Sequence, residues 1–300
     1  MKRNLFKLIL IIVPIMLIVG WLPEADIDRY GGLKGECSER SVWMYGRIYK
    51  NPKPIDVAFI GSSHTINAVE DALIMRESKN HITAVNLGFC RFGRDFHFQL
   101  IQDLIDHKKV KTIVLEVSGD ENRSGHPDFP YLGSTKNVVA SFRSSNPEYI
   151  QNIWKHFLYK IELFHDALWK IKDTSKIEDF RDTGFPEWVE QGFLPKMPTL
   201  SESEHSSNAK ANMPRVPKYY LHQIQKLCDG ANVELVYLYL PPLNSNLSAI
   251  ELEFYKQNTR LLIPPKELLE DHTKRIDRHH FNHAGAIALS RWLIGELGAN

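Results

Sequence analysis

The chain has 300 residues, of which 43% are hydrophobic and 24% are charged, and its formal net charge at pH 7 is +1. Its length suits one large domain or a domain with a sizeable insertion, and a balanced charge without a long basic run argues against nucleic acid as a partner. The three cysteines leave at least one thiol unpaired, which excludes a disulfide framework and permits at most one bridge.

Residues 1–23 predict a membrane segment. Basic residues at positions 2, 3 and 7 precede residues 8–22, which carry no charge, and acidic residues follow from Glu24. This bias predicts a retained, single-pass signal anchor with its N-terminus in the cytoplasm and the main domain outside it, in a periplasmic or other extracytoplasmic space. A cleaved signal peptide is the alternative, because the apolar core is short for a bilayer span.

Strands and helices alternate beyond a polar lead-in at residues 24–54, which contains one expected helix over 41–49. Apolar runs predict buried strands, and apolar residues at helical spacing predict helices between them. The expected strands cover residues 55–60, 82–87, 112–117 and 233–240, and the expected helices cover residues 63–77, 95–109 and 284–297. This order predicts one α/β domain over residues 55–300, a three-layer sandwich with helices on both faces of a mostly parallel sheet.

Residues 125–213 interrupt this alternation. Aromatic stretches with helical spacing come first, and residues 199–211 follow with many serines and glutamates and no apolar period, which predicts a loop. Ligands of open parallel sheets bind at the carboxyl ends of the strands. We therefore expect a helical insertion that covers one edge of the sheet and forms a lid or a substrate wall.

Two short motifs carry the candidate chemistry. Ser63 follows the first strand at the opening of a helix, where its hydroxyl would project at the edge of the sheet, although a plain helix cap also explains a serine there. Asp277 lies three residues before His280, close enough to orient an imidazole that acts as a general base. The neighbouring histidines offer a metal site as an alternative, but no HExxH pattern is present, and no metal or other cofactor is expected.

The two motifs resemble the conserved blocks of the SGNH (GDSL-like) hydrolase superfamily. Gly-Ser-Ser at residues 61–63 is similar to its Gly-Asp-Ser block, and Asp277-x-x-His280 with Asn282 behind it is similar to its C-terminal block. The N-terminal anchor and the proline-ended strand at residues 237–242 are similar to the membrane-anchored branch that includes alginate O-acetylation proteins and DltD-type proteins. The resemblance covers residues 55–120 and 215–297 and implies a flavodoxin-like sheet.

The resemblance also implies roles for individual residues. Ser63 would be the nucleophile, His280 the base and Asp277 the residue that orients it. The N–H groups of Ser63 and Gly88 would donate to the oxyanion, with Asn122 as a loose candidate for the asparagine that completes the family's oxyanion hole. The alternative for Gly88 is a glycine required by the turn, and the alternative for Asn122 is a loop residue without a role in the site.

The chain departs from the family pattern in two places. Ser62 stands where the family has aspartate, and no asparagine occupies the expected place after the third strand, where Ser118 is another possible donor. Losing one oxyanion donor lowers a rate by on the order of 10²–10³. His64 and Arg91 are candidates for holding an anionic or sugar substrate, with ordinary surface or cap duty as the alternative.

These expectations combine into a function. The chain is predicted to be an extracytoplasmic serine esterase or O-acyltransferase that acts on a cell-envelope or exported polysaccharide. Its expected partners are an acylated glycan or acyl donor, the membrane and other envelope-modification proteins. The alternative is a catalytically impaired, SGNH-like glycan-binding or assembly subunit, which the missing asparagine motivates.

Overall fold

The computed structural model describes residues 25–33, 37–119, 125–144, 146–169, 181–186 and 218–298, with positions 14, 18–20 and 22 before them. A five-stranded parallel sheet forms its centre, in the order β2-β1-β3-β4-β5. The strands are β1 (Val57–Ile60), β2 (Ala84–Asn86), β3 (Thr112–Val117), β4 (Glu234–Tyr239) and β5 (Arg260–Leu262). The predicted α/β fold with a parallel sheet is confirmed, and this strand order is the flavodoxin-like one.

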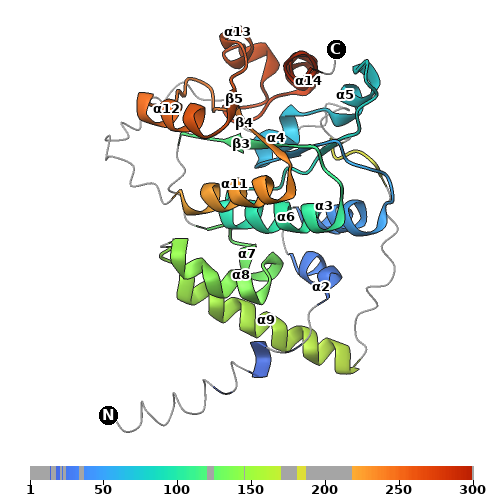
Figure 1. The fold of residues 1–300 in the computed structure, drawn as a ribbon, viewed down its shortest axis with the longest axis vertical. Helices are drawn as coiled ribbons and strands as arrows, with labels where there is room; N and C mark the ends of the chain where they lie inside the picture. The colour runs from blue at the N-terminus through green and yellow to red at the C-terminus, as the bar shows by residue number, and fades with distance from the viewer. Residues whose placement is uncertain are drawn as a thin grey trace.

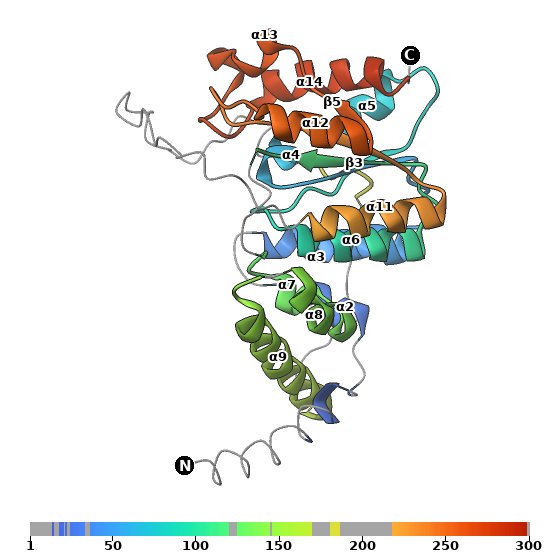
Figure 2. The ribbon, with the colours of Figure 1, turned by 60° about the vertical axis from the view of Figure 1, so that its left-hand side comes forward.

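Helices cover both faces of the sheet (Figures 1 and 2). One layer contains α3 (Ser38–Tyr45), α6 (Arg94–His107) and α11 (Tyr219–Ala231). The other contains α4 (Ser63–Ala68), α5 (Asp71–Glu77), α13 (Lys266–Leu269) and α14 (His283–Glu296). Helix α12 (Ala249–Asn258) precedes the edge strand β5 and packs Tyr255 against Tyr237 of β4, with ring centroids 5.4 Å apart.

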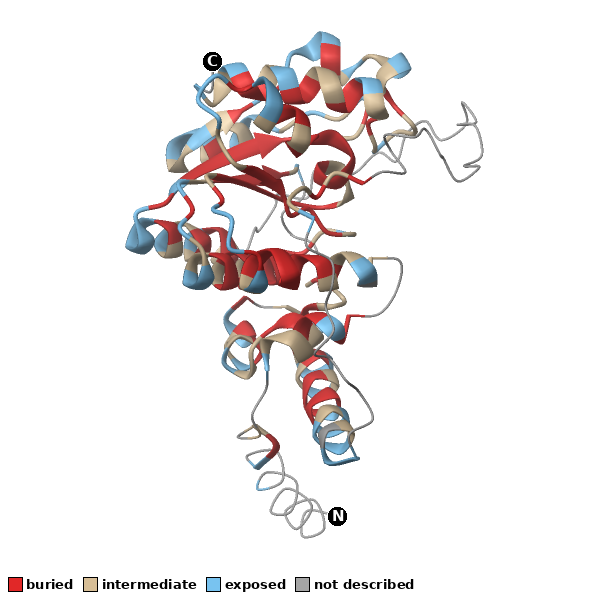
Figure 3. Ribbon diagram, turned by 90° about the vertical axis from the view of Figure 1, so that its right-hand side faces the viewer, coloured by how far each residue is buried: buried red, intermediate tan, exposed pale blue. Residues whose placement is uncertain are grey.

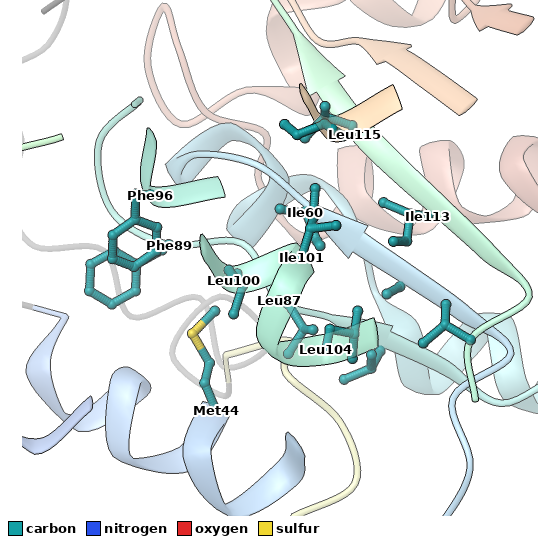
Figure 4. Packing of buried hydrophobic residues seen from close by; sticks show 14 of the residues in the cluster. Met44, Ile60, Leu87, Phe89, Phe96, Leu100, Ile101, Leu104, Ile113 and Leu115 are labelled. Carbon is teal, nitrogen blue, oxygen red and sulfur yellow. The ribbon is translucent and has the colours of Figure 1, made fainter. Parts of the chain in front are cut away.

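Alternate residues of each strand fill the two halves of the core. Ala58 and Ile60 of β1 belong to the cluster shared with α3, α6 and α11, part of which Figure 4 shows. Val57 and Phe59 belong to the cluster shared with α5 and α14. Because successive side chains of a strand point to opposite faces, a continuous apolar run is what a strand between two helical layers requires.

The helix predicted over residues 63–77 is two helices, α4 and α5. The side-chain amide of Asn86, at the end of β2, donates to the carbonyl groups of Thr65, Ile66 and Val69. These bonds satisfy carbonyls that a continuous helix would have paired internally. The break therefore depends on a residue far along the chain. The short edge strand β5 was not predicted.

The lead-in contributes more to the core than its polar composition suggests. It forms α2 (Asp26–Gly31), α3 and a π-helical turn, η1 (Gly46–Lys50). Helix α3 and η1 together span the helix that was expected over residues 41–49. Tyr30 and Trp43 are fully buried there. A disulfide joins Cys37, before α3, to Cys90, after β2, which ties the lead-in to the carboxyl end of the sheet. The third cysteine, Cys228, is buried and unpaired.

Only residues 181–186 of the described insertion lie against a sheet edge, as expected: a Cβ at Gly184 would lie 2.0 Å from the Asn86 carbonyl at the end of the edge strand β2. The described helices of the insertion do not cover an edge. They are α7 (Phe129–Leu132), α8 (Thr135–Ala140), the 3₁₀ turn η2 (Ser141–Ser144) and α9 (Tyr149–Trp169). These helices lie beyond α3 and α6, on the side away from the sheet (Figure 2). Phe129 and Leu132 of α7 are buried there, against the helical layer. Arg29 of α2 donates to the Leu132 carbonyl. The loop expected at residues 199–211 and most of residues 1–23 lie outside the described residues.

Candidate active site

Ser63 opens helix α4 at the carboxyl end of β1. Ser62 is the N-cap, and its hydroxyl accepts a hydrogen bond from the His64 N–H at 3.2 Å. Strand β1 is the point at which the strand order reverses, because β2 lies on one side of it and β3 on the other. Ligands of open α/β sheets bind at such a point, so Ser63 occupies the place in the fold where chemistry is expected.

The loop between η3 (His272–Lys274) and α14 brings His280 to this edge. Arg275 and Phe281 pair as an isolated bridge, and the Arg275 guanidinium donates to the Leu269 carbonyl at 2.9 Å. Asn282 caps α14 by accepting from the Gly285 N–H at 3.0 Å. The base of the loop is thus held by the end of α13 (Lys266–Leu269) and by the start of α14, which fixes the residues between them.

Ser63, His280 and Asp277 form one hydrogen-bonded chain. The Ser63 Oγ lies 2.9 Å from His280 Nε2, and His280 Nδ1 lies 2.8 Å from Asp277 Oδ2. Asp277 also accepts from the backbone N–H groups of His279 and His280. Burial raises the pKa of Asp277, but these hydrogen bonds outweigh it and hold the pKa below its usual value. An ionised Asp277 keeps the imidazole proton on Nδ1, so Nε2 is free to accept from the serine.

A buried carboxylate that the sequence analysis did not single out holds the nucleophile turn. Glu116 of β3 is 1% exposed and accepts from the Ser62 N–H at 2.7 Å, the Ser62 hydroxyl at 2.8 Å and the Thr65 hydroxyl at 2.7 Å. Burial raises its pKa, but hydrogen bonds from His64, Thr65 and Ser62 and the charge of His64 bring the pKa to about 2. The available signal was one acidic residue inside an apolar strand.

Gly61 makes room for this arrangement. A Cβ at Gly61 would lie 2.1 Å from the Thr65 hydroxyl oxygen and 2.3 Å from Glu116 Oε2. No side chain fits there without displacing the carboxylate, so a glycine before the nucleophile turn is a packing requirement.

His64 lies beside the triad. Its Nδ1 is 3.0 Å from the Leu240 carbonyl and 3.3 Å from Glu116 Oε1, and its ring stacks on His279 with centroids 5.6 Å apart. Burial lowers the pKa of His64, but the hydrogen bond and charge of Glu116 outweigh this and raise it. His64, which was predicted to bind substrate, therefore lies next to the nucleophile, and its raised pKa favours the protonated imidazole.

The predicted oxyanion donors are less well placed. The Gly88 N–H donates to the Asn86 side chain at 3.0 Å, and the Gly88 carbonyl accepts from Arg40. A Cβ at Gly88 would lie 2.8 Å from the Ile66 nitrogen, so Gly88 does approach the first turns of α4. The Ser63 N–H, at the first position of α4, has no acceptor within the helix. The oxyanion roles of Ser63 and Gly88 stay predictions.

The remaining predicted site residues are Asn122, Arg91 and Ser118. Asn122 falls outside the described residues. Arg91 is exposed and adopts a positive φ of 68°. Burial raises the pKa of Asp128, and the charge of Arg91 offsets part of that rise. The Ser118 carbonyl accepts from the Tyr255 hydroxyl at 2.8 Å.

A pocket of about 360 Å³ lies between α6, α8 and α11, and none of the triad residues lines it. Three of its lining residues are cationic and none is acidic: Lys136, Arg143 and Lys226. The pocket belongs to the helical layers beyond the sheet, so it is separate from the Ser63 site.

No protein-family model matches this chain, and no curated protein matches it either.

Proposed function

We propose that this protein is a serine esterase or O-acyltransferase of the SGNH type. The observation that carries the proposal is the continuous chain from the Ser63 hydroxyl through His280 to Asp277, with contacts of 2.9 Å and 2.8 Å. A serine whose hydroxyl reaches an imidazole that is itself oriented by a carboxylate is the arrangement that activates a serine nucleophile.

In the proposed reaction, Ser63 Oγ attacks the carbonyl carbon of an acyl ester while His280 Nε2 takes the serine proton. His280 then gives that proton to the departing sugar oxygen as the carbon–oxygen bond breaks, which leaves the acyl group on Ser63. Water or a second sugar hydroxyl, deprotonated by His280, then attacks the acyl-serine. His280 returns that proton to Ser63 Oγ as the bond between Oγ and the acyl carbon breaks. Asp277 stays ionised and stabilises the imidazolium in both steps.

The proposed substrate and location come from the N-terminal segment. A signal anchor at residues 1–23 would place the domain outside the cytoplasm, where an acylated cell-envelope or exported polysaccharide is within reach. The disulfide between Cys37 and Cys90 supports such a location, because disulfides persist in oxidising compartments. No helix within the described ranges combines the length and the apolarity that a bilayer span needs.

One observation favours a second candidate function. The Gly88 N–H is engaged with Asn86, and no asparagine stands at the expected place after β3. A site with too few oxyanion donors would bind an acylated glycan without turning it over. The second candidate is therefore a glycan-binding or assembly subunit of a polysaccharide modification or export system.

A fluorophosphonate probe on the full-length chain tests the choice. We expect labelling that maps to Ser63, that Ser63→Ala abolishes and that Ser245→Ala leaves in place, because Ser245 lies at the Tyr239 hydroxyl and has no part in the hydrogen-bonded chain of Ser63, His280 and Asp277. Hydrolysis of p-nitrophenyl acetate and of acetylated glycans should follow the same pattern. A folded chain that binds glycan but takes no label supports the second candidate, and turnover unaffected by Ser63→Ala rules out Ser63 as the nucleophile.

A further inference from the structure

Helix α9 exposes its apolar side chains. Trp154 is 54% exposed, Leu168 is 64% exposed and Trp169 is 70% exposed. Seven large apolar residues of the helix are exposed: Ile150, Trp154, Leu158, Ile161, Phe164, Leu168 and Trp169. At 3.6 residues per turn they fall within one sector of about 140°. The exposed stripe, as we call these seven residues, thus forms one continuous face.

The opposite face of α9 is buried (Figure 3), and it carries the polar residues His156 and Lys160 beside the aromatic Phe157 and Tyr159. His156 is fully buried, with its Nδ1 2.8 Å from the Pro130 carbonyl and its Nε2 2.9 Å from the Thr135 hydroxyl. Lys160 is 3% exposed and donates to the same hydroxyl at 3.0 Å. This is the reverse of the pattern of a helix that lies between a protein core and water. Turning the stripe inward would leave these polar groups without partners, so the stripe requires an apolar neighbour outside the domain.

The apolar N-terminal segment meets the domain at this helix. Lys160 Nζ donates to the Gly20 carbonyl at 3.2 Å, and a Cβ at Gly20 would lie 3.6 Å from the Phe157 ring. Val19 is buried beside them. The short blue helical piece at residues 18–20 lies next to α9 in both ribbon views (Figures 1 and 2). The chain therefore leaves its proposed anchor directly at α9.

We propose that α9 lies along the outer surface of the membrane, with the exposed stripe buried among the lipid headgroups and upper acyl chains. Lys155, Lys160, Glu162 and Asp166 make a transmembrane course for α9 unfavourable. An amphipathic helix with aromatic residues on its apolar face suits the interface, where tryptophan is enriched. We assign the bilayer as the partner of the exposed stripe, because the anchor holds α9 next to the bilayer in every copy of the chain. A contact with a second copy would instead depend on the protein concentration.

This contact sets the orientation of the domain. Helices α7 and α8 and the layer that contains α6 lie between α9 and the sheet (Figure 2). With α9 on the lipid, the sheet stands away from the bilayer, and Ser63 acts on a polymer above the lipid surface. The inference rests on the anchor of the proposed function and is independent of its chemistry.

Contact with lipid is measured at Leu158. In the full-length chain, Leu158→Cys is labelled with an environment-sensitive fluorophore and reconstituted into phosphatidylcholine–phosphatidylglycerol vesicles. The native thiols do not interfere, because Cys37 and Cys90 are paired and Cys228 is buried. We expect a blue shift, and a loss of fluorescence when the lipids carry a nitroxide on the upper acyl chain. Ile250→Cys on α12 is the matched control, an exposed apolar position at the other end of the domain, and should show neither effect.

The outcomes separate this inference from the proposed chemistry. Labelled chain that floats with the vesicles but remains unquenched at position 158 overturns the docking of α9 and leaves the anchor intact. Chain that does not float overturns both the anchor and the docking, while fluorophosphonate labelling of Ser63 is decided separately. A blue shift in detergent that grows with protein concentration assigns the stripe to a second copy instead. If Leu158→Cys does not fold, Trp154→Cys, one turn earlier on the stripe, gives the same measurement.

Discussion

Replacing Glu116 with glutamine tests whether the buried carboxylate holds the nucleophile turn. The substitution preserves the size of the side chain but puts an NH₂ group in place of one of the two oxygens that accept from the Ser62 N–H, the Ser62 hydroxyl and the Thr65 hydroxyl. Water cannot compensate, because Glu116 is buried. Donors therefore face donors in a site without solvent, which is costly.

The pKa of Glu116 provides the magnitude. It is about 2 in the folded chain against the ordinary 4.5. Each pKa unit corresponds to about 1.4 kcal/mol, so the ionised carboxylate contributes about 3 kcal/mol to the free energy of unfolding at neutral pH. Because the folded pKa is the lower one, this contribution is complete above pH 4.5 and is lost as the pH falls toward 2. His64 acts in the opposite direction: its raised pKa stabilises the fold below 6.5, and this effect is lost as the pH rises through the folded value.

Urea unfolding, followed by tryptophan fluorescence, measures the effect. Glu116→Gln should lower the free energy of unfolding by about 3 kcal/mol near pH 7, and the difference from the parent chain should fall to less than half near pH 3. Glu267→Gln, on the exposed first turn of α13, is the matched control and should change little. Equal stability of Glu116→Gln and the parent near pH 7, or a difference that persists unchanged in acid, would refute the assignment of this charge.

Three further substitutions have expected outcomes. Gly61→Ala introduces a Cβ 2.3 Å from the Glu116 carboxylate, so we expect a loss of about 1–3 kcal/mol in urea unfolding together with slower fluorophosphonate labelling; normal labelling would mean that the turn adapts. Asp277→Asn removes the acceptor that fixes the imidazole tautomer and should lower the labelling rate by on the order of 10³–10⁴ with little change in stability, whereas an equal loss of stability would assign Asp277 a structural role. The double substitution Cys37→Ser with Cys90→Ser removes a disulfide across a sequence separation of 53 and should lower the free energy of unfolding by about 4 kcal/mol. Reduction of the parent chain should have the same effect, and a parent chain that reduction leaves unchanged would show that the disulfide does not form.

The sheet was predictable because burial between two helical layers leaves a local pattern. Continuous apolar runs at β1, β3 and β4 can be recognised in the sequence without knowledge of their neighbours. The break between α4 and α5 could not be predicted, because it depends on the Asn86 amide, which reaches α4 only when β2 lies beside β1. The edge strand β5 has three residues, too few for a periodic signal.

The insertion was only half predictable. The aromatic stretches within residues 125–213 predict helical structure, and α9 (Tyr149–Trp169) forms there. Periodicity does not say which face a helix buries when polar and apolar residues both repeat along it. In α9 the contacts of His156 and Lys160 with Thr135 decide the question, and the apolar face is left outside. The expectation that the insertion would cover a sheet edge was wrong for its described helices, because α7 buries its apolar residues against the helical layer instead.

The sequence by itself determined the candidates for the site. Asp277 and His280 are three residues apart, so their contact is a local property of one tight loop, and a serine after a buried strand can be recognised from the strand alone. The tertiary structure alone decided that Ser63 meets His280 across 217 positions and that Glu116 accepts from the turn around Ser63. The physical reason is that a buried carboxylate is stable only where several donors converge on it, and here they come from a turn about fifty residues away that only the parallel pairing of β1 and β3 brings close.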